Sequence, residues 1–206
     1  MVSLFSMSDL ERALRATRDR EHVDIEGRAA AVSAIFRESP RGLEVLFIRR
    51  ANRDGDPWSG HMAFPGGRRD PADPDLLATA LRETREEVGL HLDRELELVG
   101  RLDDQDTSHR HRAGFLIRPF VFRLASERAR DVELVPNALE VDEIVWAPIA
   151  PMLRGEIDSS IEVSFDNVRY TLPAWDIGGR TVWGLTYRML QDVFGRVRGH
   201  DLDARA

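Results

Sequence analysis

The stretch that decides the fold is FPGGRRDPADPDLLATALRETREEVGL, residues 64–90. Its second half has the spacing of an amphipathic helix. Asp73 and Pro74 suit a helix start, and Gly89 can adopt the left-handed conformation that ends a helix. At about 100° per residue, one ridge forms that we expect to pack on a sheet. Its side chains are Leu77, Leu81, Thr84 and Val88.

Three carboxylates crowd the end of this helix. Glu83, Glu86 and Glu87 stand at positions i, i+3 and i+4, so their side chains are neighbours. Like charges at this spacing cost about 0.2–0.5 kcal/mol per pair, and carboxylates at a helix C-terminus also oppose the helix dipole. A solvated charged face is the ordinary explanation for two such glutamates. A third one, together with the Pro-Gly-Gly turn upstream, indicates a site for a hard cation such as Mg²⁺.

These residues resemble the signature of the Nudix hydrolase family. The family's box runs Gly, five residues, Glu, seven residues, then Arg-Glu-aliphatic-any-Glu-Glu-any-Gly-aliphatic. Residues 82–90, RETREEVGL, match the second half, with Thr84 in an aliphatic slot. The first half departs from the box, because a one-residue insertion is needed to place Gly67 and Asp73 in it. Asp73 either replaces the missing glutamate or caps the helix. As a cap, it predicts that Asp73→Asn is mild, since Asn caps nearly as well.

The resemblance implies the chemistry. By it, Mg²⁺ or Mn²⁺ would be held by Glu83, Glu86, Glu87 and the carbonyl of Gly67, and Arg82 would orient the carboxylates. The family breaks pyrophosphate bonds in nucleoside diphosphates linked to another group. Metal ions neutralise phosphate charge and lower the pKa of a bound water, from which a carboxylate can take the proton. Glu86 and Glu87 are the candidates in the box, and the sequence leaves the choice open.

Residues around the box resemble the coenzyme A pyrophosphatase branch of the family. Residues 60–67, GHMAFPGG, resemble the segment before the box in that branch, although Trp58 stands where His is usual. Three later stretches resemble its landmarks in the same order: residues 119–121, 137–141 and 183–186. Each is weak alone. Together they favour coenzyme A or its thioesters as substrate, split into 3′,5′-ADP and 4′-phosphopantetheine or its acyl derivative.

Other candidate residues lie outside the box. Glu140 precedes a predicted strand, where related enzymes place a further metal ligand or base, and a solvated loop glutamate is the alternative. Arg50 ends a predicted strand, and Arg110 and Arg112 lie in a basic loop with two histidines. An arginine can bind phosphate with two parallel hydrogen bonds, so these three are candidates for a substrate phosphate, and a solvated position is the more ordinary explanation for each.

Tryptophans form a further group of candidates. Trp58, Trp175 and Trp183 could stack on an adenine, but a packing role is the more ordinary explanation for each.

Two other functions remain open. One is hydrolysis of ADP-ribose, a dinucleotide or another nucleoside diphosphate derivative. The other is a non-catalytic binding or regulatory module with a Nudix fold. Loss of box carboxylates or a DNA-binding region would favour the module, but all three helix carboxylates are present and no such region is visible.

The remaining chain favours an α/β fold, because strand-like runs surround the central helix. Strands are predicted at residues 30–38, 43–51, 96–102, 115–124 and 142–146, with a hairpin at 161–172, and further helices at 9–18, 148–154 and 182–193. The resemblance implies a Nudix-type α/β/α sandwich with mixed β-sheets. We expect a single domain over residues 1–206, with residues 1–25 as a helical extension and residues 64–90 as the box.

Composition excludes several classes of partner and location. With 42% apolar residues and no run of about 18 of them, no membrane span is expected, and the N-terminus lacks a basic leader, so a cytoplasmic location is predicted. The net charge of −7 argues against binding nucleic acid through a broad basic face. No cysteine is present to supply a thiolate ligand or nucleophile. The expected partner is a small nucleotide-derived molecule, and a homodimer is left open.

Overall fold

A computed structural model of the chain describes residues 5–18, 28–53, 55, 58–91, 95–107, 116–125, 132–165 and 168–203. Within them the helices are α1 (Met7–Arg18), α2 (Leu76–Val88), α3 (Ile149–Leu153) and α4 (Gly184–Asp203). The strands of the larger sheet are β1 (Ala29–Ser39), β2 (Gly42–Arg50), β3 (Met62–Ala63), β4 (Gly66–Arg68), β5 (Leu96–Arg101), β6 (Gln105–Asp106), β7 (Leu116–Leu124) and β8 (Val141–Pro148). A smaller sheet contains β9 (Asp158–Phe165), β10 (Val168–Asp176) and β11 (Thr181–Trp183).

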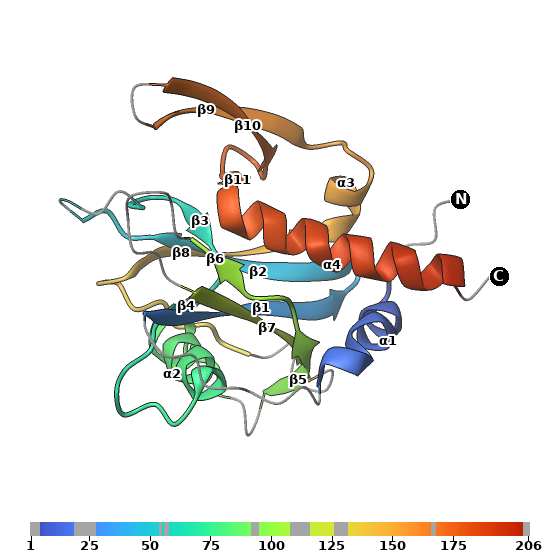
Figure 1. The fold of residues 1–206 in the computed structure, drawn as a ribbon, viewed down its shortest axis with the longest axis horizontal. Helices are drawn as coiled ribbons and strands as arrows, with labels where there is room; N and C mark the ends of the chain where they lie inside the picture. The colour runs from blue at the N-terminus through green and yellow to red at the C-terminus, as the bar shows by residue number, and fades with distance from the viewer. Residues whose placement is uncertain are drawn as a thin grey trace.

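The larger sheet is mixed, and β1 lies at its centre (Figure 1). One edge of β1 pairs with β7 in parallel. The other edge is divided between two antiparallel partners: β4 pairs with residues 30–32, and β2 pairs with residues 36–39. Beyond this division, β2 continues into pairings with β3 and β8. β1 therefore holds the Pro-Gly-Gly turn before α2 through β4, and it holds the first half of β2, whose other end carries Arg50.

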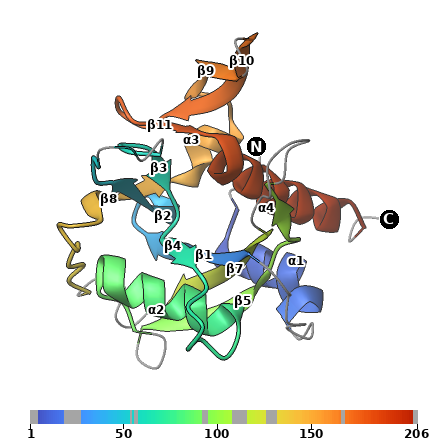
Figure 2. The ribbon, with the colours of Figure 1, turned by 60° about the vertical axis from the view of Figure 1, so that its left-hand side comes forward.

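Side chains of β1 and β2 alternate between two apolar cores, as the two-residue period of a strand requires. One core contains Ala34, Phe36, Val45 and Phe47, together with residues of α1 and α4. The other contains Ala31, Ile35, Leu46 and Ile48, together with Leu76, Ala80 and Val88 of α2. Helices thus cover both faces of the sheet (Figure 2). The predicted α/β/α sandwich with a mixed sheet is confirmed.

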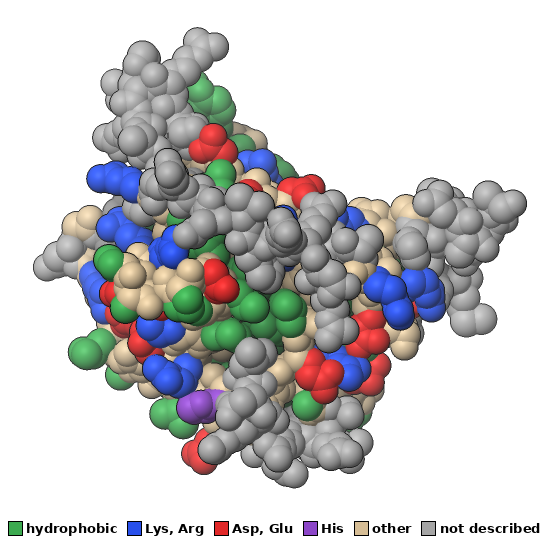
Figure 3. All heavy atoms as spheres, turned by 60° about the horizontal axis from the view of Figure 1, so that its bottom comes forward, with side chains coloured by type: hydrophobic (Ala, Val, Ile, Leu, Met, Phe, Trp, Pro, Cys, Tyr) green, Lys and Arg blue, Asp and Glu red, His purple; other side chains and the backbone are tan. Residues whose placement is uncertain are grey.

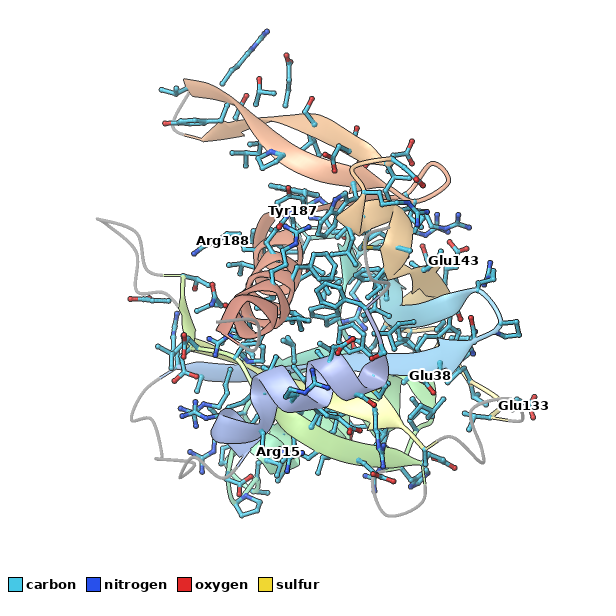
Figure 4. The ribbon with its side chains drawn as sticks, turned by 90° about the vertical axis from the view of Figure 1, so that its right-hand side faces the viewer. Arg15, Glu38, Glu133, Glu143, Tyr187 and Arg188 are labelled. Carbon is cyan, nitrogen blue, oxygen red and sulfur yellow. The ribbon has the colours of Figure 1, made fainter. Side chains whose placement is uncertain are left out.

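The β9–β10 hairpin extends away from the body of the molecule (Figures 1 and 2). Its base is anchored by Trp175, which is fully buried and lies 4.2 Å from the ring of Tyr187 on α4. Figure 4 shows Tyr187 at the end of α4 nearest the hairpin. After β10, Arg180 forms an ion pair with Glu143 of β8. Aromatic packing and one charge pair therefore hold the hairpin to the body.

Several predicted boundaries need correction. α1 begins at Met7 rather than Asp9, because Ser6 and Asp9 cap it reciprocally through side-chain hydrogen bonds. The closing helix begins at Gly184, and residues 182–183 belong to β11, which pairs with β10. The short strands β3, β4 and β6 were not predicted, because two or three residues show no periodicity. The other predicted strands are present within a few residues of their expected ends.

Charge on the face shown in Figure 3 is mixed. Arginines and acidic side chains are interspersed along its left side, and an apolar area occupies its centre. Within the described ranges, no helix combines the length and apolar character needed to cross a membrane.

Candidate active site

The helix of the box starts later than predicted. α2 begins at Leu76, and its cap is Asp75, whose carboxylate accepts a hydrogen bond of 2.7 Å from the amide of Ala78. The prediction that Asp73 and Pro74 start the helix is therefore wrong. The predicted end is confirmed, because Gly89 takes the left-handed conformation with φ of 79°.

Asp73 has a different role. It is 7% exposed, and its carboxylate accepts hydrogen bonds from Nε and Nη2 of Arg82 at 3.1 and 3.0 Å. The amide of Asp70 and the hydroxyl of Thr79 donate to the same carboxylate at 3.0 and 2.9 Å. The hydrogen bonds from Arg82 hold the pKa of Asp73 below its usual value. Asp73 thus anchors Arg82 from the position that the box gives to glutamate.

Arg82 joins the carboxylates to the turn. Its Nη1 donates to Oε1 of Glu83 at 2.9 Å and to Oε2 of Glu86 at 3.0 Å. Its Nη2 also donates to the carbonyl of Arg68 at 3.1 Å. Hydrogen bonds that Arg82 donates to Asp73, followed by the charge of Glu83, raise the pKa of Arg82. One guanidinium therefore offsets the repulsion among the glutamates and ties α2 to β4.

The face of α2 that packs on the sheet is turned slightly from the predicted ridge. Thr84 and Val88 are buried as expected, whereas Leu77 and Leu81 are only partly buried against the core. The fully buried positions are Leu76, Thr79, Ala80, Thr84, Glu87 and Val88. Thr84 donates a hydrogen bond of 2.8 Å to the hydroxyl of Ser33 on β1, so a polar residue fits the aliphatic slot. This orientation turns one of the three glutamates inward.

That glutamate is Glu87, which is 3% exposed. Its Oε2 accepts a hydrogen bond of 2.8 Å from the amide of Gly66. Burial raises the pKa of Glu87 to about 8, although the Gly66 amide and the charge of Arg50 oppose the rise. Burial also raises the pKa of Glu83, which Arg82 partly offsets. Both carboxyl groups therefore lie where a negative charge is costly without a cation.

The two glycines of the turn are required by close contacts. Gly66 has φ of 152°, and a Cβ there would lie 2.3 Å from the backbone oxygen of Ala31. A Cβ on Gly67 would lie 2.5 Å from Oε1 of Glu83. At Gly66 a side chain would collide with the backbone of β1, whereas at Gly67 it would displace the carboxylate of Glu83.

Glu140 approaches the box carboxylates Glu83 and Glu87 from a loop. The amide of Asn137 donates to the carbonyl of Glu87 at 3.1 Å, and the amide of Ala51 donates to the carbonyl of Glu140 at 2.9 Å. The negative charge of Glu140 contributes to the raised pKa values of Glu83 and Glu87. The predicted loop carboxylate therefore lies close enough to interact with the box.

The arginine candidates divide into two groups. Arg50 ends β2, and its positive charge acts on Glu87, so it lies at the cluster. Arg110 and Arg112, with the histidines beside them, lie outside the described residues.

Sequence reasoning missed Arg53. Its guanidinium donates to the carbonyl of Leu139 at 3.1 and 2.6 Å and to Oε1 of Glu140 at 3.3 Å. It thus clamps the loop that carries Glu140. No sequence signal could have shown this, because 87 positions separate Arg53 from Glu140.

The donor set fits a hard divalent cation, although it is not yet arranged as a ligand shell. Among the described residues, no three His, Asp or Glu side chains already converge as metal ligands. The reason is visible at Arg82, which occupies oxygens of Glu83 and Glu86. Burial raises the pKa values of Glu83 and Glu87, so a bound cation would stabilise their ionised forms. Carboxylate and carbonyl oxygens are the ligands that Mg²⁺ and Mn²⁺ prefer.

Comparisons with known proteins identify the family. The family model of the NUDIX domain matches residues 27–165. The mitochondrial coenzyme A diphosphatase NUDT8 of Homo sapiens is 36% identical over 159 residues, covering 72% of this chain and 61% of that protein. The peroxisomal coenzyme A diphosphatase NUDT7 of Mus musculus is 38% identical over 102 residues, covering 48% of this chain and 38% of that protein.

A solved structure gives the same picture of the fold. A MutT/nudix family protein from Enterococcus faecalis aligns with a TM-score of 0.56 and 18% identity, covering 95% of this chain and 70% of that one. The chain spans less than two thirds of the length of the two coenzyme A diphosphatases. The box, the fold and the family model agree, and this chain belongs to the Nudix hydrolase family.

Proposed function

We propose that this chain is a pyrophosphohydrolase that depends on Mg²⁺ or Mn²⁺ and splits coenzyme A or its thioesters. The observation that carries the proposal is the group of box carboxylates held by Arg82 against the Gly66-Gly67 turn, with Glu87 buried among them. The choice of substrate is supported by the 36% identity to a protein named a coenzyme A diphosphatase. The products would be 3′,5′-ADP and 4′-phosphopantetheine or its acyl derivative.

The residues of the site have two roles, metal binding and positioning. Glu83, Glu86, Glu87 and the Gly67 carbonyl would hold the metal ion. When bound, the ion supplies charge neutralisation of the pyrophosphate and a lowered pKa of water. Asp73 and Arg82 position the glutamates, because their hydrogen bonds fix the orientation of two of the three side chains.

Water is the nucleophile in this reaction: its oxygen bonds to one phosphorus as the bridging oxygen leaves that phosphorus. The proton released by the water passes to a carboxylate, for which Glu86, Glu87 and Glu140 are the candidates. Arg50 would bind a phosphate from the end of β2, and Arg110 and Arg112 would bind the 3′-phosphate of coenzyme A.

The test compares substrates under one metal condition. We expect coenzyme A to be cleaved faster than 3′-dephospho-coenzyme A or ADP-ribose, measured as kcat/KM with products identified by mass. EDTA should abolish turnover, and Mg²⁺ or Mn²⁺ should restore it. Turnover that persists in fully chelated enzyme contradicts the metal. A preference of about tenfold (about 1.4 kcal/mol) for ADP-ribose contradicts the substrate but leaves the reaction class intact.

Glu140 is tested separately. If it is a supplementary metal ligand or base, Glu140→Gln should lower kcat more than it raises KM, as expected of a group that acts mainly in the transition state. The amide keeps the size of the side chain and its hydrogen bond from Arg53. A wild-type kcat in this variant would show that Glu140 is only a solvated loop residue.

We also propose a homodimer and a cytoplasmic location. The dimer is supported by the β9–β10 hairpin, because beyond its pairing with β11 it is a two-stranded ribbon, which is only marginally stable in water by itself. Val168 on this hairpin is an exposed apolar residue. Light scattering should give twice the chain mass, and Val168→Asp should shift it toward the monomer. Fractionation of the source cells tests the location.

A further inference from the structure

The described tryptophans are of two kinds. Trp175 is fully buried, and Trp146 is covered by the guanidinium of Arg37 at 4.1 Å. Trp58 is 52% exposed. Trp183 is partly buried, yet it belongs to neither apolar core of the described residues, although its neighbour Val182 does. Packing against the cores therefore explains Trp175 and Trp146, which is partly buried, and leaves Trp58 and Trp183 to be explained.

Trp58 and Trp183 are joined by a histidine. The ring of His61 lies 5.8 Å from that of Trp58, at 75°, and 5.2 Å from that of Trp183, at 64°. Trp183 comes from β11, which lies beside β3, the strand that follows His61 (Figures 1 and 2). We call Trp58, His61 and Trp183 the aromatic platform. Single exposed aromatic residues are ordinary, but three in edge-to-face contact form a continuous surface.

The aromatic platform is bonded to the end of β2, the strand end that brings Arg50 to the box carboxylates. The amide of Arg50 donates to the carbonyl of His61 at 3.1 Å, and the amide of Gly60 donates to the carbonyl of Arg50 at 3.0 Å. The charge of the same Arg50 acts on Glu87. The next residue, Ala51, bonds to the backbone of Glu140. Two consecutive residues, Arg50 and Ala51, thus connect the backbone of the platform to the backbone of Glu140.

A second connection fixes this arrangement. The amide of Arg53 donates to the hydroxyl of Ser59 at 2.9 Å, and that hydroxyl donates back to the carbonyl of Arg53 at 2.9 Å. The side chain of Arg53 holds the loop of Leu139 and Glu140. The segment next to Trp58 is therefore clamped to the loop that carries a candidate catalytic carboxylate.

We propose that the aromatic platform binds the nucleobase of the substrate, with Arg50 between the base and the pyrophosphate. This rests on the proposed function, because it assigns one half of a nucleoside diphosphate derivative to a place beside the same site. Every purine offers a π-face that an exposed indole can stack on, and the half-exposed ring of Trp58 is the accessible part of the platform. The adenylyl half of the substrate would lie toward β3 and β11.

The test measures AMP binding by calorimetry, which needs no turnover. Trp58→Leu should weaken AMP binding at least ~5-fold, the lower end of what one stacked base contributes, and Trp58→Phe should restore most of it. Ribose 5-phosphate, which lacks the base, should bind wild type and Trp58→Leu equally. Tyr170→Leu is the matched control, because it removes another exposed aromatic residue, on the hairpin, and AMP affinity should not change.

Three binding results overturn the platform: equal AMP affinity in wild type and Trp58→Leu, no AMP binding to wild type at millimolar concentration, or a loss of affinity in Trp58→Leu for 4′-phosphopantetheine but not for AMP. In turnover of coenzyme A, Trp58→Leu should raise KM with little change in kcat. An unchanged KM contradicts the platform while leaving the hydrolase intact. If coenzyme A is not cleaved but AMP binding depends on Trp58, the platform stands and the proposed reaction falls.

Discussion

The box region and the β9–β10 hairpin handle polar groups in opposite ways. Around α2, charged side chains are bonded to one another, and two of them, Asp73 and Glu87, are buried: Asp73 holds Arg82, and Arg82 holds two glutamates. On the hairpin, Glu162 and Thr171 stand opposite each other and both are exposed. A buried polar group has few acceptable partners, whereas water accepts almost any substitution. The amino-acid sequence of α2 is therefore constrained residue by residue, whereas that of the hairpin is constrained mainly at its apolar base.

The largest expected effect is on Glu87. Glu87→Gln should lower kcat at least ~100-fold, because it removes charge from metal binding or proton transfer. The amide can still accept the hydrogen bond from Gly66, so the free energy of unfolding should change by less than about 1 kcal/mol. Steady-state kinetics with coenzyme A and urea unfolding measure the two effects. An active variant would show that burial of Glu87 serves packing alone.

Asp73 and its neighbour Asp75 provide a matched pair. Asp73→Asn should lower the free energy of unfolding by about 2 kcal/mol, because it weakens charged hydrogen bonds to Arg82. Asp75→Asn should be nearly neutral, since Asn caps a helix as well as Asp does. Urea unfolding of both variants at neutral pH measures the difference. Equal stabilities would mean that Asp73 is no more than a second polar group near the helix start.

The stabilisation of the fold by Asp73 should depend on pH. The pKa of Asp73 is lowered in the folded protein by hydrogen bonds from Arg82, so ionised Asp73 stabilises the fold above the pKa of an unfolded aspartate, about 4. That stabilisation is lost as pH falls through the folded pKa. The gap in unfolding free energy between wild type and Asp73→Asn should therefore narrow below about pH 4. A gap that stays constant to low pH contradicts the charge argument.

The smallest effects should occur on the hairpin. Glu162→Gln and Thr171→Val change exposed side chains, so each should alter the free energy of unfolding by less than about 0.5 kcal/mol and leave kcat unchanged. Thermal melts and turnover of coenzyme A measure both quantities. A loss of activity in either variant would break the comparison, because it would give the exposed face of the hairpin a part in the reaction.

Local pattern was enough for some features and not for others. The left-handed end of α2 at Gly89 was predictable, because glycine adopts that conformation at little cost. The strands β1 and β2 were predictable from their apolar runs. The strands β3 and β4 were missed because each is held by pairing with β2 or β1 rather than by its own periodicity. The cap at Asp75 was missed because two aspartates flank Pro74 and both suit a helix start.

By itself, the sequence determined that three glutamates share one side of a helix between a glycine turn and a glycine stop, because helical spacing is a local property. It also determined the resemblance to the Nudix box. Only the tertiary structure decided that Glu87 is buried while Glu86 is exposed, because depth depends on how Thr84 meets Ser33 on β1. It likewise decided that Asp73 holds Arg82 and that Arg53 holds the Glu140 loop, since contacts between distant residues exist only once the chain has folded.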